Sequence, residues 1–514
     1  MIRKELVKLI KEAAKKLYKE EAEVRIERPE NSVFGDYSTN VAMVLNKNPN
    51  EIASAIKSDL IERVEVKNGF VNFFISKDYL VKELKEILKE KEKFGQVRLG
   101  KGKKVNVEFI SANPTGPLTL GNGRGGFCGD VLANVLNRAD FKAEREYYVN
   151  DAGEQIRKLG HSVFGDQEAV YQGPYIEELK KKIKGNSVED VGKRAAKVIL
   201  EEMIKPSVRK MGIDFDVWFS ESNLYKEKED DKVLNLLKEK KLVYESEGAL
   251  WFESTKFGDD KDRVLIKADG EKTYLASDTA YLKNKFKRGF KKLIFIWGAD
   301  HYGYINRIKG AAEVMGYKKG DVDIIIMQLV RLIQGGQEVK MSKRTGIYVT
   351  IDELIDEVGL DAARFFFLAR GNDSHLAFDL DLAKEQSEKN PVYYVQYAYA
   401  RICSIISKIS NSKFKIQNKF PDLKLLNKPV ELDLIKQLII LPEIIEDTAK
   451  DYQVQRLPQY ALDLASSFHR FYQECRVISE DIKLSQARLA LIEATRIVLK
   501  NTLGLMGVSA PEKM

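Results

Sequence analysis

The chain has 514 residues, enough for three or four domains with sizeable cores, and its 85 Lys and Arg outnumber its 77 Asp and Glu by a formal charge of +8. This modest basic excess permits a polyanionic partner without requiring one. Three widely spaced cysteines and four histidines without metal-ligand spacing argue against a disulfide framework and a metallohydrolase, and the lack of an eighteen-residue apolar run or a signal-peptide core predicts a cytoplasmic protein without a membrane span.

The first 97 residues are predicted to form a small α/β domain. Apolar residues on one face of 2–19, with lysines opposite, indicate an amphipathic helix. Two short alternating strands follow within 63–75, joined at Asn68-Gly69, a dipeptide that favours a type I′ hairpin because both residues tolerate positive φ. A helix near 78–92 completes the unit, which by itself would equally fit a packing or oligomerisation module.

Residues 105–126 predict a strand, a loop and the start of a helix. The β-branched and aromatic run that begins at Val105 is typical of a buried strand, and two prolines and a glycine between Ser111 and Leu120 exclude regular structure. Apolar residues return at helical spacing from Gly123 onward. Because unpaired N–H groups at a helix N-terminus attract anions, this pattern predicts a phosphate-binding site.

The glycines of this stretch leave two other interpretations open. Gly121, Gly123 and Gly126 fit the G-x-G-x-x-G dinucleotide fingerprint, and Glu146 follows twenty residues later as a candidate ribose-binding acid. The match is weak, because the fingerprint begins where a strand ends and here a loop of about ten residues intervenes. A glycine turn with a purely structural role is the third possibility.

The next apolar run ends in the polar stretch Tyr147-Tyr-Val-Asn-Asp-Ala-Gly-Glu-Gln155. In a nucleotide-binding sheet such a strand delivers polar side chains to its carboxyl edge, where ligands bind. Residues 156–260 are charged and helical with few strand signals. They are predicted to be a helical insertion between two halves of the nucleotide-binding fold, or simply a solvated helical layer.

Carboxylates reappear in 269–281, a segment predicted to open a helix with Ser277 or Asp278 as its N-cap. Capping alone would account for Asp278. Glu108 is more informative, since an acid in an apolar buried strand is costly unless a cation pairs with it.

A further strand over 293–297 runs directly into Gly298-Ala-Asp-His301, where the glycine allows close approach at a strand's carboxyl end. Strand 323–327 leads to a basic, glycine-bounded loop over 331–346. Lysines in such a loop are usually ordinary solvated charge, but mobile ammonium groups can also neutralise charge on a departing pyrophosphate.

Beyond Asn390 the chain is predicted to be almost wholly helical. Four tyrosines lie within two turns of one helix: Tyr393, Tyr394, Tyr397 and Tyr399. Most are expected in the core, although tyrosine rings can also stack on unpaired bases of single-stranded RNA.

Several of these stretches resemble arginyl-tRNA synthetases. The run Ser111-Ala-Asn-Pro-Thr-Gly-Pro-Leu-x-x-Gly-x-Gly-Arg124 is similar to the family's first signature. Lys340-Met-Ser-Lys-Arg344 is the second class I synthetase signature in full, over two hundred residues later and in the correct order. Residues 35–43 resemble a motif of the family's additional N-terminal domain, which contacts the tRNA elbow, and 457–514 resemble the close of its anticodon-binding domain.

The resemblance implies an α/β protein built on a class I, Rossmann-like nucleotide-binding catalytic domain. Three domains are implied: a tRNA-contacting domain over 1–97, the catalytic domain over 98–388 with a helical insertion around 156–260, and an α-helical anticodon-binding domain over 389–514. The implied activity is arginine–tRNA ligation, in which ATP and L-arginine form arginyl-adenylate and the arginyl group passes to the 3′ end of tRNA(Arg). Mg²⁺ is expected with ATP, and we expect a monomer.

Carried over residue by residue, the family's site falls on three sets of positions. The catalytic set is Thr119, Asn122, Lys340 and Lys343. The ATP-binding set is Gly121, Gly123, Arg124, Asp300, His301, Met341 and Ser342. The arginine-binding set is Glu108, Asn113, Tyr274 and Asp278, and no metal ligand is predicted.

Thr119 and Asn122 stand where the family normally carries the two histidines of His-x-Gly-His. Those histidines donate hydrogen bonds to ATP phosphate oxygens as charge builds, and a threonine hydroxyl and an asparagine amide each keep a neutral donor. We therefore expect an active enzyme. The alternative is a paralogue that has lost activation chemistry and acts as a tRNA-binding or regulatory protein, whereas a nicotinamide-dependent oxidoreductase is disfavoured by the intact second signature.

Overall fold

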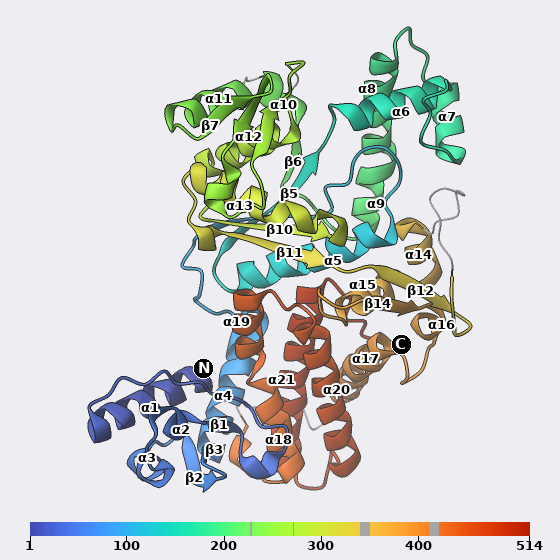
Figure 1. Cartoon of the computed structure of the whole chain (residues 1–514). Helices are drawn as coiled ribbons and strands as arrows, with labels where there is room; N and C mark the ends of the chain where they lie inside the picture. The colour runs from blue at the N-terminus through green and yellow to red at the C-terminus, as the bar shows by residue number, and fades with distance from the viewer. Residues whose placement is uncertain (227–228, 271, 340–349, 411–420) are drawn as a thin grey trace.

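The computed structural model describes residues 1–226, 229–270, 272–339, 350–410 and 421–514. A parallel sheet lies in the middle of the molecule, with insertion helices above it, a bundle of long helices below it and a small N-terminal lobe beside the bundle (Figure 1). Among the described residues, no helix has both the length and the apolarity needed to cross a membrane.

The N-terminal lobe is a three-stranded antiparallel sheet covered by helices, with strands in the order β1-β3-β2. Its elements are α1 (Ile2–Tyr18), β1 (Tyr37–Thr39), α2 (Val41–Leu45), α3 (Pro49–Ala55), β2 (Ile61–Lys67), β3 (Phe70–Ile75) and α4 (Lys77–Glu90). The predicted helix, hairpin and closing helix are confirmed. Asn68 and Gly69 adopt φ values of 52° and 79°, as a type I′ turn requires.

The central sheet has five parallel strands in the order β11-β10-β4-β5-β6. They are β4 (Lys104–Glu108), β5 (Lys142–Val149), β6 (Val217–Ser220), β10 (Lys292–Gly298) and β11 (Val322–Met327), and α5 (Leu120–Arg138) connects β4 to β5. After β4 the chain adds β5 and β6 on one side of that strand, and it later adds β10 and β11 on the other side. The strand order therefore reverses between β4 and β10. Ligands of open parallel sheets bind at such a switch point, beyond the carboxyl ends of the strands.

The segment between β5 and β10 is less helical than predicted. Its helices are α6 (Glu154–Phe164), α7 (Pro174–Lys182), α8 (Val188–Ile199), α9 (Lys205–Lys210), α10 (Ser222–Lys226), α11 (Glu229–Glu239) and α12 (Tyr274–Lys287). It also holds β6, which is the edge strand of the central sheet, and a small antiparallel sheet of β7 (Val243–Ser246), β8 (Ala249–Phe252) and β9 (Arg263–Ile266). Residues 156–260 were predicted to be helical with few strands, and within that range the structure has the strands β6, β7 and β8 among its helices. Strands of four residues carry little periodic signal in the sequence.

After β10 come α13 (Ile305–Val314), α14 (Ile351–Val358), α15 (Leu360–Leu368), α16 (Leu380–Lys384) and a small sheet of β12 (Val330–Gln334), β13 (Gln337–Glu338) and β14 (Leu376–Asp379). The bundle below consists of α17 (Pro391–Ser410), α18 (Pro429–Leu438), α19 (Leu441–Asp451), α20 (Arg456–Glu474) and α21 (Ile482–Met506). The predicted helical C-terminal region is confirmed.

The N-terminal lobe is attached to the bundle by buried and partly buried polar contacts. The Tyr37 hydroxyl donates to Glu443 at 3.1 Å, and the Arg3 guanidinium pairs with Asp447 at 2.7 Å. Apolar residues of the lobe, the sheet and the bundle belong to one continuous core. The lobe and the bundle therefore hold a defined position relative to the sheet.

Candidate active site

A cavity of about 870 Å³ opens at the carboxyl end of β10, beside the loop after β4 and the N-terminus of α5. Its walls come from that loop, the first turn of α5, the residues after β10 and part of the insertion. Six of the predicted site residues line it: Asn113, Thr119, Gly121, Asn122, Asp300 and His301. The cavity lies at the switch point of the sheet, where ligand binding is expected.

The chain leaves β4 through two residues with left-handed backbone conformation. Ile110 has φ 64° and Ser111 has φ 39°, and for a β-branched residue this costs about 1–3 kcal/mol. The Tyr148 N–H donates to the Ser111 hydroxyl at 3.1 Å, and the Tyr147 hydroxyl donates to the carbonyl of Ala112 at 2.9 Å. These bonds from β5 hold the strained turn, which directs the loop over the sheet edge and into the cavity wall.

Thr119 and Asn122 form a reciprocal cap at the start of α5. Both the N–H and the hydroxyl of Thr119 donate to Oδ1 of Asn122, at 3.0 and 2.9 Å. Because Oδ1 accepts both bonds, the amide nitrogen of Asn122 must point away from Thr119. The pair thus offers one amide donor next to the unpaired backbone N–H groups of a 19-residue helix.

The glycines at the start of α5 differ in role. Gly121 is exposed and lines the cavity. Gly123 is buried, and a Cβ added there would lie 2.5 Å from Ile351 of α14; a Cβ on Gly126 would lie 2.6 Å from Met211. Gly123 and Gly126 therefore allow close packing, and the structure does not place Gly123 on the cavity wall.

Arg124 also lies away from the cavity. Its side chain is fully buried and donates to the backbone carbonyls of Gln328 and Gly371, at 2.7 and 2.8 Å. Arg124 was predicted to add positive charge to an ATP site, but in this structure its two terminal nitrogens tie α5 to the loops before β12 and β14.

The opposite wall combines the end of β10 with the insertion. Asp300 and His301 are exposed and form an ion pair at 3.5 Å when the imidazole is protonated. Tyr171 and Tyr175 come from the stretch before and into α7, and the Tyr175 hydroxyl donates to the carbonyl of Thr115 at 3.0 Å. Sequence reasoning missed these two tyrosines because their charged surroundings suggested a solvated layer.

Acidic side chains meet where α12 faces β4 and β6. Burial, together with the charges of Glu221 and Glu108, raises the pKa of Asp278 to about 7, and the charge of Arg307 opposes this rise. Asp278 is not the N-cap predicted for this helix, since α12 begins at Tyr274 with Thr273 at the N-cap position. A carboxylate surrounded mainly by other carboxylates is poised to receive a cation.

Glu221 was not predicted. It follows β6 directly and its side chain is almost fully buried. The only sequence signal for it was a polar residue at the end of a short aromatic strand, Val217 to Ser220, inside a segment taken as helical.

Glu108 has an internal cation. Its carboxylate accepts hydrogen bonds from the Lys285 ammonium and the Tyr281 hydroxyl, both at 2.8 Å. Neighbouring Glu146 lies 3.1 Å from the same ammonium and also bonds Arg288 and Tyr281. Burial alone would raise the pKa of Glu146, but Lys285 and Arg288 bring it to about 2. The dinucleotide interpretation fails here, because Glu146 is fully buried in this cluster and lines no ligand cavity in the described part of the chain.

Five predicted residues cannot be placed. Lys340, Met341, Ser342 and Lys343 lie outside the described residues. Tyr274 is the first residue of α12, but its side chain is likewise outside the description.

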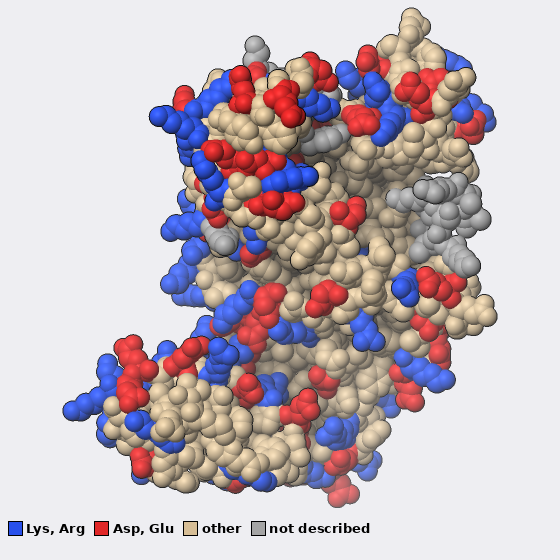
Figure 2. Space-filling view, in the orientation of Figure 1, with Lys and Arg blue, Asp and Glu red and all other residues tan. Residues whose placement is uncertain are grey.

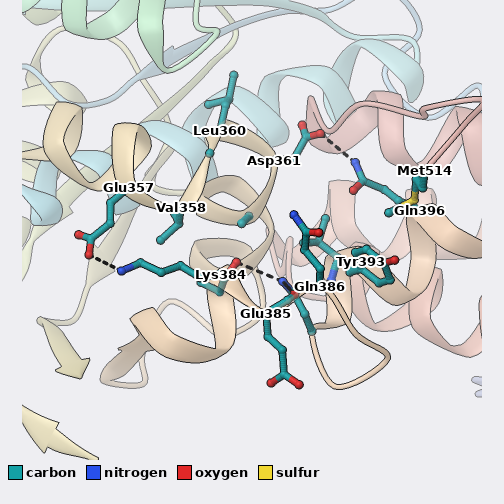
Figure 3. A pocket seen from close by; sticks show the side chains of 15 residues that line it. Glu357, Val358, Leu360, Asp361, Lys384, Glu385, Gln386, Tyr393, Gln396 and Met514 are labelled. Atoms are coloured by element: carbon teal, nitrogen blue, oxygen red, sulfur yellow. Dashed lines mark hydrogen bonds and ion pairs between the residues drawn. The ribbon is translucent and has the colours of Figure 1, made fainter. Parts of the chain in front are cut away.

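A second cavity, of about 730 Å³, lies where α14, α15, α16 and α17 meet the C-terminus (Figure 3). Gln396 donates to Asp361 at 2.8 Å, and Lys384 pairs with Glu357 at 2.5 Å, so several of its polar groups already bond one another. None of the predicted catalytic, ATP-binding or arginine-binding residues lines this cavity.

Three family models match the chain in order. They are the arginyl tRNA synthetase N-terminal domain over residues 4–75, the catalytic domain of class I (R) tRNA synthetases over 163–379, and the DALR anticodon binding domain over 395–514.

Curated relatives match along nearly the whole chain. An arginine–tRNA ligase of Caldanaerobacter subterraneus subsp. tengcongensis is 47% identical over 96% of this chain and 94% of its own length. Arginine–tRNA ligase 1 of Halalkalibacterium halodurans is 43% identical over 100% of this chain and 98% of its own.

Solved structures agree with the fold. A structure described as an arginyl-tRNA synthetase of Campylobacter jejuni superposes with a TM-score of 0.78 at 34% identity, covering 86% of this chain and 100% of the other. The arginyl-tRNA synthetase of Thermus thermophilus reaches a TM-score of 0.82 over the whole of both chains at 22% identity, which shows the fold alone.

Proposed function

The chain belongs to the arginyl-tRNA synthetases, the class I family whose members join arginine to tRNA, and on that premise we propose how its cavity carries out arginine–tRNA ligation. The observation that carries the proposal is the juxtaposition of two chemistries at one sheet edge. Donors at the N-terminus of α5 suit a phosphate chain, and the carboxylates around Asp278 suit a substrate with cationic groups.

At the arginine end, Asp278 receives the cationic side chain of the substrate, and Glu221 adds a second carboxylate. A guanidinium is planar and permanently charged, so a carboxylate can bind it through two parallel hydrogen bonds. Asn113 on the cavity wall and Tyr274 at the start of α12 supply neutral contacts, and Glu108 acts through the buried cluster.

At the phosphate end, Asn122 donates from its amide nitrogen and Thr119 holds that amide in place. This refines the expectation that both side chains donate to phosphate, since the Thr119 hydroxyl proton is directed at Asn122. Gly121 leaves the backbone N–H groups accessible, and Asp300 and His301 flank the adenosine. Lys340, Met341, Ser342 and Lys343 of the second signature lie outside the described residues, and the family resemblance assigns them the neutralisation of charge on the departing pyrophosphate.

The reaction proceeds without a covalent protein intermediate. A carboxylate oxygen of arginine attacks the α-phosphorus of ATP, the bond to the bridging oxygen breaks, and pyrophosphate leaves with that electron pair. A ribose hydroxyl at the tRNA 3′ end then attacks the carbonyl carbon of arginyl-adenylate, the bond to the phosphate oxygen breaks, and AMP leaves with that electron pair while its phosphate takes up the hydroxyl proton. The enzyme accelerates both steps by positioning the reacting groups and by stabilising the charge that develops in the transition state.

Mg²⁺ enters as part of the nucleotide substrate. The described residues contain no group of three or more His, Cys, Asp or Glu arranged to hold a metal ion. ATP binds Mg²⁺ through its phosphates, so the ion needs few protein ligands.

The helical bundle offers an RNA-binding surface. Tyr397 is 43% exposed and its ring stacks on Tyr393 at 6.4 Å, whereas Tyr399 is buried. A groove of about 490 Å³ between α17 and α20 is lined by Arg401 and Arg476, and basic groups of this kind bind phosphates. In Figure 2, basic and acidic side chains are interspersed over the face shown, so tRNA binding would depend on local groups of this kind.

Domain boundaries after residues 97 and 388, a monomeric state and a cytoplasmic location complete the proposal. The polar contacts between the N-terminal lobe and the bundle, from Tyr37 to Glu443 and from Arg3 to Asp447, support one rigid tRNA-binding unit. Gel filtration with light scattering tests the monomer, for which a mass near 58.6 kDa is expected.

Arginine-dependent exchange of pyrophosphate into ATP, with tRNA(Arg) present, tests the activity. Exchange that requires arginine and is not supported by lysine is the expected result. If the protein binds tRNA(Arg) but catalyses no exchange under these conditions, it is the tRNA-binding paralogue and not the enzyme.

A further inference from the structure

The first turn of α14 packs against the loop and the helix N-terminus that form the phosphate end of the cavity. The Ile351 N–H donates to the carbonyl of Leu118 at 3.1 Å, and Thr350 pairs with Thr119, which lines the cavity, in an antiparallel bridge. A Cβ on Gly123 would lie 2.5 Å from the Ile351 side chain, so α5 and α14 touch at this point. The position of α14 therefore limits where the N-terminus of α5 can lie.

The same turn of α14 is also held by α9. The buried Ser207 hydroxyl donates to Oδ2 of Asp352 at 2.6 Å, and the Lys210 ammonium donates to the backbone carbonyl of Asp352 at 3.1 Å. Oδ1 of Asp352 is buried and has no hydrogen-bond partner among the described residues. The side-chain partner of this carboxylate in the described part of the chain therefore comes from the insertion.

Helix α9 is itself firmly placed. A π-helical segment, Leu200–Ile204, joins it to α8, and such segments are frequent at functional sites. A Cβ on Gly126 of α5 would lie 2.6 Å from the side chain of Met211, the residue directly after α9. The Met211 carbonyl accepts from the buried Arg364 guanidinium at 2.7 Å. Helices α5, α9 and α14 therefore meet in one close-packed junction.

An acid in the first turn of a helix also stabilises the helix dipole, which would be a purely structural role for Asp352. The neighbouring residues already cap this helix. The Glu353 N–H donates to the Thr350 hydroxyl at 3.1 Å, and the Thr350 N–H donates to the Glu353 carboxylate at 2.7 Å, which makes a capping box. Capping of α14 therefore does not require Asp352.

We propose that Asp352 is a positioning residue for arginine activation: through Ser207 it fixes the first turn of α14, and thereby holds the donors of α5 where they meet the phosphates of ATP. Asp352 does not line the cavity. The inference rests on the proposed phosphate-binding role of Asn122 and adds the residues that hold this end of α5 in place. Because a misplacement of about 1 Å can cost about 100-fold in rate, loss of the contact should lower kcat and leave the KM for arginine nearly unchanged.

The test compares two acids that lie one turn apart on α14 and both contact α9. Asp352→Ala removes the bond to Ser207, whereas Asp356→Ala removes an exposed carboxylate that pairs with Lys210 at 2.6 Å. The kcat and the KM for arginine are measured by pyrophosphate exchange with saturating ATP and tRNA(Arg). We expect Asp352→Ala to lower kcat about tenfold with the KM for arginine within about twofold of wild type, and Asp356→Ala to leave both unchanged.

Three further variants show whether the effect passes through the proposed contacts. Asp352→Asn keeps an oxygen acceptor for Ser207 and should recover most of the wild-type kcat, whereas a residue needed only for the helix dipole would not be rescued by a neutral side chain. Ser207→Ala should lower kcat about threefold or more. In an Asn122→Ala background, Asp352→Ala should cost less in kcat than in wild type, because both changes act on the same donors.

Melting temperatures identify variants that do not fold, and Ser207→Ala and Asp352→Asn keep the inference testable if Asp352→Ala is one of them. A wild-type kcat in Ser207→Ala and in folded Asp352→Ala would overturn the role of Asp352. Equal losses in Asp352→Ala and Asp356→Ala, or a kcat in Asp352→Asn as low as in Asp352→Ala, would overturn it as well.

Asn122→Ala separates this inference from the one beneath it. A wild-type kcat in Asn122→Ala would refute the assignment of the phosphate end itself. If Asn122→Ala lowers kcat while Asp352→Ala and Ser207→Ala do not, that assignment stands and only the positioning role of Asp352 is overturned.

Discussion

Glu108 and Asp278 are two acids predicted for the same ligand, and the structure gives them opposite surroundings. Glu108 is buried in the sheet with an ammonium and a phenol hydroxyl, each at 2.8 Å. Asp278, on the helix that packs against it, has Glu221 and Glu108 as its main charged neighbours, and its pKa is raised to about 7. The cation that Glu108 needs is part of the protein, whereas the contacts described for Asp278 include no ion pair, and Arg307 offsets its carboxylate neighbours only in part.

This difference shows how to interpret an acid in an apolar strand. Burial requires a partner, but it does not say whether the partner is a substrate or a side chain. An acid whose charge the protein compensates only in part, near the ligand-binding edge of the sheet, is the better candidate for substrate recognition.

The largest effect is expected from Asp278→Asn. Removing a carboxylate that pairs with a desolvated cation costs on the order of 2–5 kcal/mol, so the KM for arginine should rise roughly 30-fold or more with little change for ATP. Asp356→Asn, a matched change at an exposed carboxylate that pairs with Lys210 on α9, should leave both KM values unchanged. An unaltered arginine KM in Asp278→Asn would mean that Asp278 does not bind the substrate, and that it does not differ from Glu108 in this respect.

Asn122→Ala should lower arginine activation at least tenfold at saturating substrates, because it removes the amide donor from the phosphate end. Thr119→Ala should also lower arginine activation at least tenfold, because the Asn122 amide is no longer held in place. Thr119→Ser keeps the hydroxyl and should activate arginine at nearly the wild-type rate. Circular dichroism melts control for unfolding of α5. If Asn122→Ala and Thr119→Ala both activate arginine at the wild-type rate, these side chains have no catalytic role.

The arginine KM should fall as pH rises, because Asp278 must be ionised to bind a cation. With a pKa of about 7, the ionised fraction grows about fourfold between pH 6.5 and pH 8, and the KM should fall by the same factor. The dependence should disappear in Asp278→Asn. A KM that rises with pH would contradict the sign of the shift.

Asp278 should also cost stability in the absence of arginine. Its folded-state pKa is raised above the unfolded value, so the folded protein binds more protons between about pH 4 and pH 7 and loses stability as pH rises through that range. Asp278→Asn should therefore melt at least a degree higher than wild type at pH 8, and the difference should shrink toward pH 4. If wild type and Asp278→Asn melt at the same temperature at pH 8, the ionised Asp278 carboxylate does not destabilise the folded protein.

Tyr397→Ala tests the RNA-binding surface that is proposed on the bundle. Loss of one stacking surface costs about 1–3 kcal/mol per base, so the KM for tRNA(Arg) should rise at least several-fold while the KM for arginine stays constant. Tyr244→Ala, at an exposed tyrosine of β7, is the matched control.

Local patterns predicted much of the fold and the function. The Asn68-Gly69 hairpin, the strand before the phosphate loop and the helical C-terminus depend on neighbours in sequence, and all are confirmed. The two signatures pointed to arginyl-tRNA synthetases, and the comparisons confirm that family.

What the sequence could not reveal depends on contacts across the chain. Glu108 meets Lys285 177 residues away, and only the register of the sheet against α12 brings them together. Glu221 follows a strand of four residues that carries little periodic signal. Arg124 belongs to a glycine-rich signature, yet its guanidinium bonds carbonyls more than two hundred residues away.

A crystal structure of the protein with L-arginine bound tests the central claim most directly. The account predicts that the guanidinium lies within hydrogen-bond distance of Asp278, with Glu221 nearby, and that Glu108 still bonds Lys285. Arginine bound to Glu108 with Lys285 displaced, or bound away from Asp278 altogether, would contradict it.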